Sequence, residues 1–281
     1  MTFLDRIAEC NRHDLARFVP FSVAGVRVGW VRRASLDLLR EFAGVFVVDA
    51  HALTLHPDLR DAAERTAALA PVLRTLEARG VIEGWRNEHY PVSVSFRAAP
   101  LLLIERAAVP FFGVRAYGVH MNGFVRRSDG LHLWVARRSA TKQTYPGQLD
   151  NTVAGGQPVG IGLLENLVKE CGEEAAIPEA LARRAQPVGV ITYCMEAQEG
   201  LLPDAQFCFD LELPDDFTPT NTDGEVDEFF LWPIEKVFEV VRDSAQFKFN
   251  CNLVLIDFFI RHGVLKPDEP DYIEIARGLT P

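Results

Sequence analysis

Hydrophobic residues recur at helical spacing in the first third of the chain, between short runs rich in β-branched residues. Residues 57–79 form the clearest predicted helix, and Gly80 follows as a stop signal. Leu69, Val72 and Leu76 would share the buried face of this helix. The same reasoning predicts a helix over 3–18, a strand, turn and strand over 20–31, a short helix over 36–42 and a strand-like run over 45–55. The pattern indicates a small α+β unit.

From residue 111 onward, strand-like segments predominate and helices lie on either side of them. The segments 112–127 and 131–139 flank Asp129-Gly130, a pair that favours a tight β-hairpin turn. The other elements expected here are strands over 187–194, 206–213 and 229–232 and helices over 162–176, 234–241 and 249–261. This arrangement predicts an α/β fold in which a mixed sheet lies between helices.

Charge is divided unevenly along the 281 residues. Residues 1–110 hold 14 arginines, no lysine and 13 acidic residues, a net charge of +1. Residues 111–281 hold 15 basic and 26 acidic residues, a net charge of −11. We therefore place a domain boundary near Pro110 and expect any divalent cation in the second domain. The total charge of −10 argues against binding to nucleic acid or to an anionic membrane surface.

The chain is 48% apolar and 24% charged, which is typical of a globular protein. No apolar run approaches the roughly 18 residues that a membrane-spanning helix needs. The five cysteines are spread without a CxxC pair, so they indicate reduced thiols rather than disulfides or a zinc site. The N-terminal segment carries acids and a histidine where a secretory signal would need an apolar stretch. These features predict a cytoplasmic protein.

Three glutamates gather on one flank of the helix expected over 162–176. At about 100° per residue, Glu170, Glu173 and Glu174 begin where the apolar stripe of that helix ends. The stripe consists of Leu164, Leu167, Val168, Cys171 and Ala175. Like charges at i,i+4 spacing repel each other, and a hard divalent cation such as Mg²⁺ would remove that penalty. Lys169 lies one turn from both Glu165 and Glu173 and is expected to pair with them. The alternative is an ordinary solvated acidic face.

The spacing of these residues resembles the Nudix box, the sequence motif of the Nudix hydrolases. That motif reads Gly, five residues, Glu, seven residues, Arg-Glu, an apolar residue, any residue, Glu-Glu, any residue, Gly and an apolar residue. Aligning Glu170, Glu173 and Glu174 with the metal-binding carboxylates of the motif places Gly155 on its first glycine. The chain departs from the motif at three positions, where it has Ile161 for Glu, Lys169 for Arg and Ala176 for Gly.

A longer resemblance, over nearly all of residues 1–265, is to a Nudix subgroup with an extra N-terminal domain. Its members occur fused to thiamine pyrophosphokinase in fungi or in plant plastids. The segments that carry the resemblance are VAGGQPVGIGLLENLVKECGEEAAIP, DLELPDDFTPTNTDGEVDEFFL and IDFFIRHG. It implies a Nudix α/β/α sandwich over 111–281, preceded by an α+β domain of unknown role over 1–110. It also implies a hydrolase that uses Mg²⁺, with Mn²⁺ as the other candidate metal, and cleaves thiamine diphosphate or its oxidised analogues.

The resemblance implies roles for several residues. Glu170, Glu173 and Glu174, together with the carbonyl group of Gly155, would hold the metal, and Lys169 would support the glutamates. Glu225 is the candidate general base, because a base must reach the attacking water while Glu174 is occupied by metal. Candidates for contact with phosphate oxygens are Arg137, Arg138 and Lys142, and candidates for lining the substrate pocket are Tyr145, Asp150 and Asn151. For Glu225 the alternative is a solvated loop acid, and for Arg137, Arg138 and Lys142 it is an ordinary surface residue.

Two other functions stay open at this point. One is a non-catalytic Nudix-fold sensor of a diphosphate metabolite, which Ile161 and Lys169 favour and the intact carboxylates oppose. The other is a pyrophosphatase for nucleoside-diphosphate sugars or dinucleotides, because pocket residues vary more than the box. In each case the expected partner is a small-molecule diphosphate, and a homodimer is left open.

Overall fold

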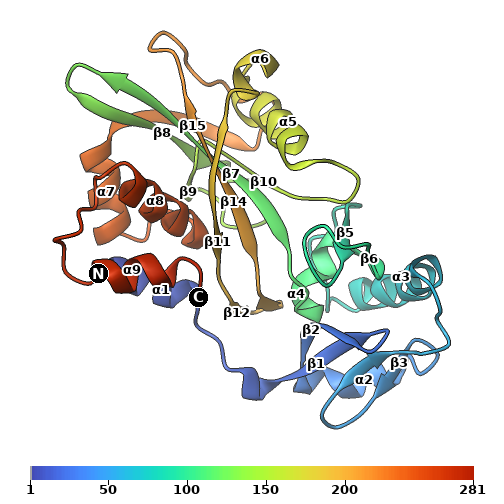
Figure 1. The fold of residues 1–281 in the computed structure, drawn as a ribbon. Helices are drawn as coiled ribbons and strands as arrows, with labels where there is room; N and C mark the ends of the chain where they lie inside the picture. Colours follow the sequence, from blue (N-terminus) through green and yellow to red (C-terminus); the bar gives the residue numbers. More distant parts are fainter. Residues whose placement is uncertain (1) are drawn as a thin grey trace.

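A computed structural model describes residues 2–281 (Figure 1). The first part of the chain forms a sheet of strand order β2-β1-β4-β3, with α2, α3 and the β5–β6 pair beside it. Its elements are α1 (Phe3–Cys10), β1 (Phe18–Val23), β2 (Val26–Arg32), α2 (Leu36–Arg40), β3 (Phe46–Val48), β4 (Leu53–Leu55), α3 (Ala62–Ala78), β5 (His89–Val92), β6 (Leu102–Glu105) and α4 (Val109–Phe112).

The second part is built on a larger mixed sheet of strand order β11-β14-β7-β8-β15, with β10 paired to β7 and β9 to β8. Strands β14 and β7 are parallel, and the other pairs are antiparallel. Its elements are β7 (Tyr117–Arg127), β8 (Gly130–Arg138), β9 (Leu149–Asp150), β10 (Val153–Gly156), α5 (Leu163–Ala175), α6 (Glu179–Ala182), β11 (Gln186–Thr192), β12 (Met195–Ala197), β13 (Gly200–Leu202), β14 (Ala205–Glu212), β15 (Val226–Pro233), α7 (Ile234–Asp243), α8 (Phe249–Arg261) and α9 (Tyr272–Gly278).

Helices cover both faces of this sheet, so the predicted α/β/α sandwich is confirmed (Figure 1). Alternation along β7 explains the two layers, because successive side chains of a strand point to opposite faces. Val119 and Met121 pack with α5 on one face, whereas Phe124 belongs to the core formed with α7 and α8 on the other. The predicted hairpin is also present, with β7 and β8 joined at Asp129-Gly130.

The first helix is shorter than predicted and packs away from the rest of the N-terminal region. A helix was expected over 3–18, but α1 ends at Cys10, Asp14 caps a short 3₁₀ turn, and β1 begins at Phe18. Phe3 and Ile7 lie in the same hydrophobic core as α7, α8 and α9 (Figure 1). A separate core spans Val19 to Val114. The domain boundary near residue 110 stays a prediction. Helix α1 precedes that boundary in the sequence but packs with helices that follow it.

Several short elements were not predicted. The strand-like run over 45–55 contains two antiparallel strands, because the chain turns between β3 and β4. The β5–β6 and β12–β13 pairs and the short helices α6 and α9 were missed. Each is too short to show a clear hydrophobic period in the sequence. Tertiary contacts determine these elements more than local pattern does.

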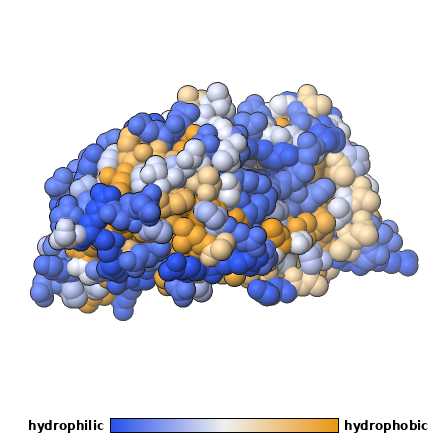
Figure 2. All heavy atoms as spheres, turned by 90° about the horizontal axis from the view of Figure 1, so that it is seen from above, coloured by the Kyte–Doolittle hydropathy of each residue, from blue (hydrophilic) through white to orange (hydrophobic). Residues whose placement is uncertain are grey.

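The surface seen from above is largely hydrophilic, and hydrophobic side chains appear between the polar ones in separate patches (Figure 2). All five cysteines are free thiols, as predicted, and four of them are buried. Within residues 2–281, no helix combines the length and the apolarity that crossing a membrane requires.

The end of α5 gives a test of one departure from the Nudix box. Ala176 follows the helix with φ 51° and ψ 29°, a left-handed conformation that glycine adopts more easily. Ala176→Gly should therefore raise the free energy of unfolding by about 1 kcal/mol, measured by urea denaturation. Ala175→Gly, one residue earlier and inside the helix, is the matched control and should lower it by about 1 kcal/mol. Destabilisation by both changes would contradict this reading of Ala176.

Candidate active site

Helix α5, which carries the predicted metal ligands, is fixed against β10 by a buried face and by a side-chain hydrogen bond. Leu167 and Cys171 are fully buried on that face. The side-chain amide of Asn166 donates to the carbonyl oxygen of Gly156 at 2.8 Å. The expected stripe differs at its start, because Leu164 is 38% exposed and Leu163 packs on the core instead. The helix therefore turns the flank that holds Glu170 and Glu174 toward the end of β10.

Glu170 and Glu174 lie directly on the backbone of β10. Glu174 is only 6% exposed, and its carboxylate accepts a hydrogen bond from the Ala154 N–H at 2.9 Å. Burial raises the pKa of Glu174 to about 8. A methyl group on Gly155 would come within 2.4 Å of the carboxyl carbon of Glu170, so only glycine leaves room for this contact. Burial also raises the pKa of Glu170, which the charge on Lys169 partly offsets.

Lys169 and Glu173 form the outer part of the same flank. The ammonium group of Lys169 lies 2.6 Å from Glu173 and 3.3 Å from Glu170, so the predicted pair with Glu173 is confirmed. The predicted pair with Glu165 is wrong. Glu165 instead receives two hydrogen bonds, of 2.9 and 2.8 Å, from Arg183 just after α6, which competes successfully for that carboxylate.

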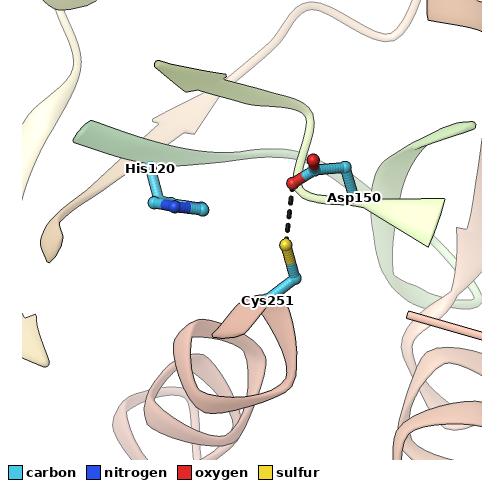
Figure 3. A group of neighbouring side chains, drawn as sticks. All are labelled: His120, Asp150 and Cys251. Atoms are coloured by element: carbon cyan, nitrogen blue, oxygen red, sulfur yellow. Dashed lines mark hydrogen bonds between the residues drawn. The ribbon is translucent and has the colours of Figure 1, made fainter. Parts of the chain in front are cut away.

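The ligand atoms of the three glutamates are not drawn into one tight cluster. In the part of the chain that the structure describes, the one group of three metal-ligating side chains with atoms within 4.8 Å of one another is His120, Asp150 and Cys251 (Figure 3). These residues come from β7, β9 and α8, and the Cys251 thiol donates to Asp150 at 2.7 Å. The group lies in the interior between the sheet and α8.

The chemistry of this buried group suits a hydrogen-bond network better than a Mg²⁺ site. Burial raises the pKa of Cys251, so its thiol stays protonated, and burial lowers the pKa of His120 to about 4. Burial alone would raise the pKa of Asp150, but the positive charges of Lys248 and Arg138 lower it. Asp150 is thus an ionised carboxylate already paired with Arg138 at 2.7 Å. Mg²⁺ prefers oxygen ligands, and of these three side chains only that of Asp150 offers oxygen atoms.

Glu225, the predicted general base, lies immediately before β15. It forms an ion pair with Lys142, and its carbonyl oxygen accepts a hydrogen bond from the Ser139 N–H at 2.9 Å. Burial lowers the pKa of Lys142, and the negative charge of Glu174 acts against that shift. Lys142 is therefore paired with the predicted base and also feels the charge of Glu174, one of the predicted metal ligands.

The other predicted substrate contacts are divided between two environments. Arg138 is buried and donates to Asp150 and to the backbone carbonyls of Thr144 and Tyr145, so its guanidinium is fully engaged within the protein. Arg137 lies over the ring of Phe230, 5.3 Å from its centre, and is not brought to the glutamates. The ring of Tyr145 packs on Phe249, and the Asn151 side chain is hydrogen-bonded to His120 at 2.8 Å and to Asn122 at 2.9 Å.

Sequence reasoning missed the residues that the N-terminal region brings to this place. Tyr90 and Arg106 contact Gly156, the residue after the glycine of the box. A pocket of about 230 Å³ lies beside them, lined by Pro91, Phe96 and Arg97 from one region and by Gln157, Ile161 and Leu163 from the other. Ile161, which replaces the glutamate of the motif, thus lines a pocket between the two regions. No motif marks Tyr90 or Arg106, because their position follows from the packing of distant segments.

Comparison with known proteins places this geometry in a family. Residues 2–116 match a family model described as a domain of unknown function, DUF4743. Over 281 residues the chain is 46% identical to Nudix hydrolase 24, chloroplastic, of Arabidopsis thaliana, covering 99% of this chain and 77% of the relative. The chain belongs to the Nudix hydrolases. Nudix hydrolase 20, chloroplastic, of the same plant is 44% identical, with the same coverage of both chains.

The Nudix relatives correct one prediction. Both plant proteins are named chloroplastic, and this finding overturns the expectation of a cytoplasmic protein.

Among solved structures, the NUDIX domain of Shewanella oneidensis NrtR complexed with ADP ribose is 13% identical, with a TM-score of 0.42 over 54% of this chain and 90% of that domain.

The predicted cation site around Gly155 can be tested without any substrate. Adding Mg²⁺ should raise the melting temperature of the wild-type Nudix protein, because a cation bound only to the folded state stabilises it by about 2.7 kcal/mol at a hundredfold excess over Kd. Glu174→Gln should abolish most of that shift. Glu212→Gln, which alters an exposed carboxylate paired with Arg126, is the control and should retain it. An equal shift in both variants would place the cation elsewhere.

Proposed function

We propose that this Nudix hydrolase cleaves an organic diphosphate to the monophosphate and phosphate, with Mg²⁺ as its metal and Mn²⁺ as the alternative. Thiamine diphosphate or its oxidised analogues are the proposed substrates, on the strength of the resemblance described above. The observation that carries the proposal is the pair of carboxylates, Glu170 and Glu174, buried against Gly155 and Ala154. These two acids are largely shielded from water, and their carboxylate oxygens are the kind of ligand that Mg²⁺ prefers.

The glutamates and one backbone carbonyl would hold the cation. Glu170 and Glu174 are the inner ligands, the carbonyl oxygen of Gly155 is a further ligand, and Glu173 approaches from the exposed side of α5. Lys169 orients Glu170 and Glu173 through its two ion pairs. A divalent cation bound there would polarise the phosphoryl oxygens and lower the pKa of water.

Glu225 is the proposed general base. A carboxylate oxygen of Glu225 would take a proton from the attacking water, whose oxygen forms a bond to phosphorus while the bond to the bridging oxygen breaks. The monophosphate leaves with that bridging oxygen. Lys142 fixes the position of Glu225 and carries a positive charge toward the substrate phosphates.

The remaining predicted residues have supporting roles in this proposal. Arg138 and Asp150 form a buried ion pair that keeps the loop before β10 in place. Asn151 stabilises the same loop by a hydrogen bond to Asn122. Tyr145 and Arg137 would line the outer part of the substrate site. We propose residues 111–281 as the hydrolase domain and residues 1–110 as an additional domain.

A substrate panel tests the proposed function directly. The full chain is incubated with thiamine diphosphate, oxidised thiamine diphosphate, ADP-ribose and NADH, with Mg²⁺, with Mn²⁺ and with a chelator, and the products are separated. The proposal predicts metal-dependent formation of the monophosphate and phosphate from a thiamine compound. Preferred cleavage of ADP-ribose or NADH would support a dinucleotide pyrophosphatase. Tight binding with no turnover would support a sensor.

The inner ligands give the sharpest mutational test. Glu170→Gln and Glu174→Gln should each lower kcat by roughly 10²–10⁴, because loss of a ligand forfeits several kcal/mol of charge stabilisation. Thermal stability without metal should hold or rise slightly, since each change replaces a desolvated acid by a neutral amide of the same size. Turnover close to that of the wild type in both variants would overturn the assignment of the metal ligands.

Lys169 tests how the lysine replaces the arginine of the Nudix box. Lys169→Ala should lower kcat about tenfold, because Glu170 and Glu173 lose their shared partner. Lys169→Arg should retain most of the activity. Glu165→Ala is the control, since Glu165 pairs with Arg183 and not with Lys169, and should leave kcat unchanged. An unchanged kcat in Lys169→Ala would show that Lys169 is an ordinary surface residue with no role in supporting the glutamates.

A further inference from the structure

The N-terminal region reaches the Nudix box through the paired strands β5 and β6. His89 pairs with Glu105 across these antiparallel strands, so Tyr90 and Arg106 come from neighbouring positions at one end of the pair. The backbone N–H of Arg106 donates to the Glu88 carbonyl oxygen at 2.8 Å, and the Val159 N–H donates to the His89 carbonyl oxygen at 3.1 Å. The end of the strand pair is therefore tied to the loop before α5.

Arg106 closely approaches Gly156, the residue that follows the glycine of the proposed metal site. A methyl group on Gly156 would collide with the Tyr90 hydroxyl and would come within 3.3 Å of the guanidinium carbon of Arg106. Gly156 directly follows Gly155, whose backbone contacts the Glu170 carboxylate. Two glycines in succession thus allow two close approaches, one by the metal-binding helix and one by the N-terminal region.

The charges of Arg106 and Glu170 interact in this arrangement. Burial lowers the pKa of Arg106, but the negative charges nearby, Glu170 among them, raise it. The guanidinium therefore stays charged at the edge of the carboxylate site.

Much of the hydrogen-bonding capacity of Arg106 is unused within the described residues. Its guanidinium donates to one partner there, the carboxylate of Glu88 at 2.8 Å, while the group offers five N–H donors in a planar fork. The side chain is 41% exposed, and its guanidinium carbon lies over the buried ring of Tyr90, 5.6 Å from the ring centre. A half-exposed guanidinium packed over an aromatic ring near the proposed metal site is suited to binding phosphate oxygens.

We infer that Arg106 is a substrate-binding residue of the Nudix site and that it contacts the phosphate oxygens of the diphosphate. This inference rests on the proposed function, because it requires a diphosphate at the glutamates. The N-terminal region would then contribute directly to substrate binding in the active site. A pocket lies between residues 91–100 and 157–163, and Pro91 and Gln157, which follow Tyr90 and Gly156 in the chain, line it. This pocket offers space for the organic group of the diphosphate substrate.

Binding of methylenediphosphonate, a diphosphate analogue that is not hydrolysed, measures this role in the full chain with Mg²⁺. Arg106→Ala should weaken its Kd at least tenfold and raise KM for thiamine diphosphate by a similar factor, with little change in melting temperature. Arg106→Lys, which keeps the charge but not the fork, should lie between the wild type and Arg106→Ala. Arg79→Ala removes a comparable surface ion pair, with Glu41 at 2.8 Å, and should bind like the wild type.

Glu88→Gln separates phosphate binding from a structural role. It removes the ion pair but leaves the guanidinium, so it should bind methylenediphosphonate as tightly as the wild type or more tightly. Loss of binding in Glu88→Gln equal to that in Arg106→Ala would overturn the inference, as would Arg106→Ala binding within twofold of the wild type. A wild-type chain that neither binds the analogue nor hydrolyses any diphosphate would overturn the proposed function itself, and this inference with it.

Discussion

Burial of two carboxylates against the end of β10 is the constraint on which the rest of this site depends. Glu174 is held by the Ala154 N–H, and Glu170 occupies the space that a side chain at residue 155 would fill. Removing carboxylates from water is costly unless opposite charge lies nearby. Lys142, Lys169 and Arg106 supply part of that charge from three different segments of the chain. A divalent cation would supply the remainder, which links the stability of the fold to the chemistry of the site.

The sequence was most informative where regular periodicity coincided with chemistry. The helical stripe through Leu167 and Cys171 placed the glutamates on the correct flank of α5, and the Lys169–Glu173 pair followed from i,i+4 spacing. The same spacing failed for Glu165, because Arg183 comes from another element and forms two hydrogen bonds. Local spacing lists the partners that are within reach, whereas tertiary packing selects among them.

The N-terminal region makes contacts that its position along the chain does not predict. A change in charge near residue 110 suggested a separate unit, yet α1 packs with the C-terminal helices and β5–β6 carries Tyr90 and Arg106 to the Nudix box. Neither contact could be read from the sequence, since each joins segments far apart in it. Removing residues 1–110 would therefore expose the core around α8 as well as alter the site. Single substitutions give a cleaner view of what this region contributes.

The position of the bound metal tests the central claim most directly. Anomalous scattering from a crystal of the full chain grown with Mn²⁺ locates the ion without reference to activity. We predict a peak between the carboxylates of Glu170 and Glu174 and the carbonyl oxygen of Gly155. A peak at His120, Asp150 and Cys251, with none at the glutamates, would contradict it.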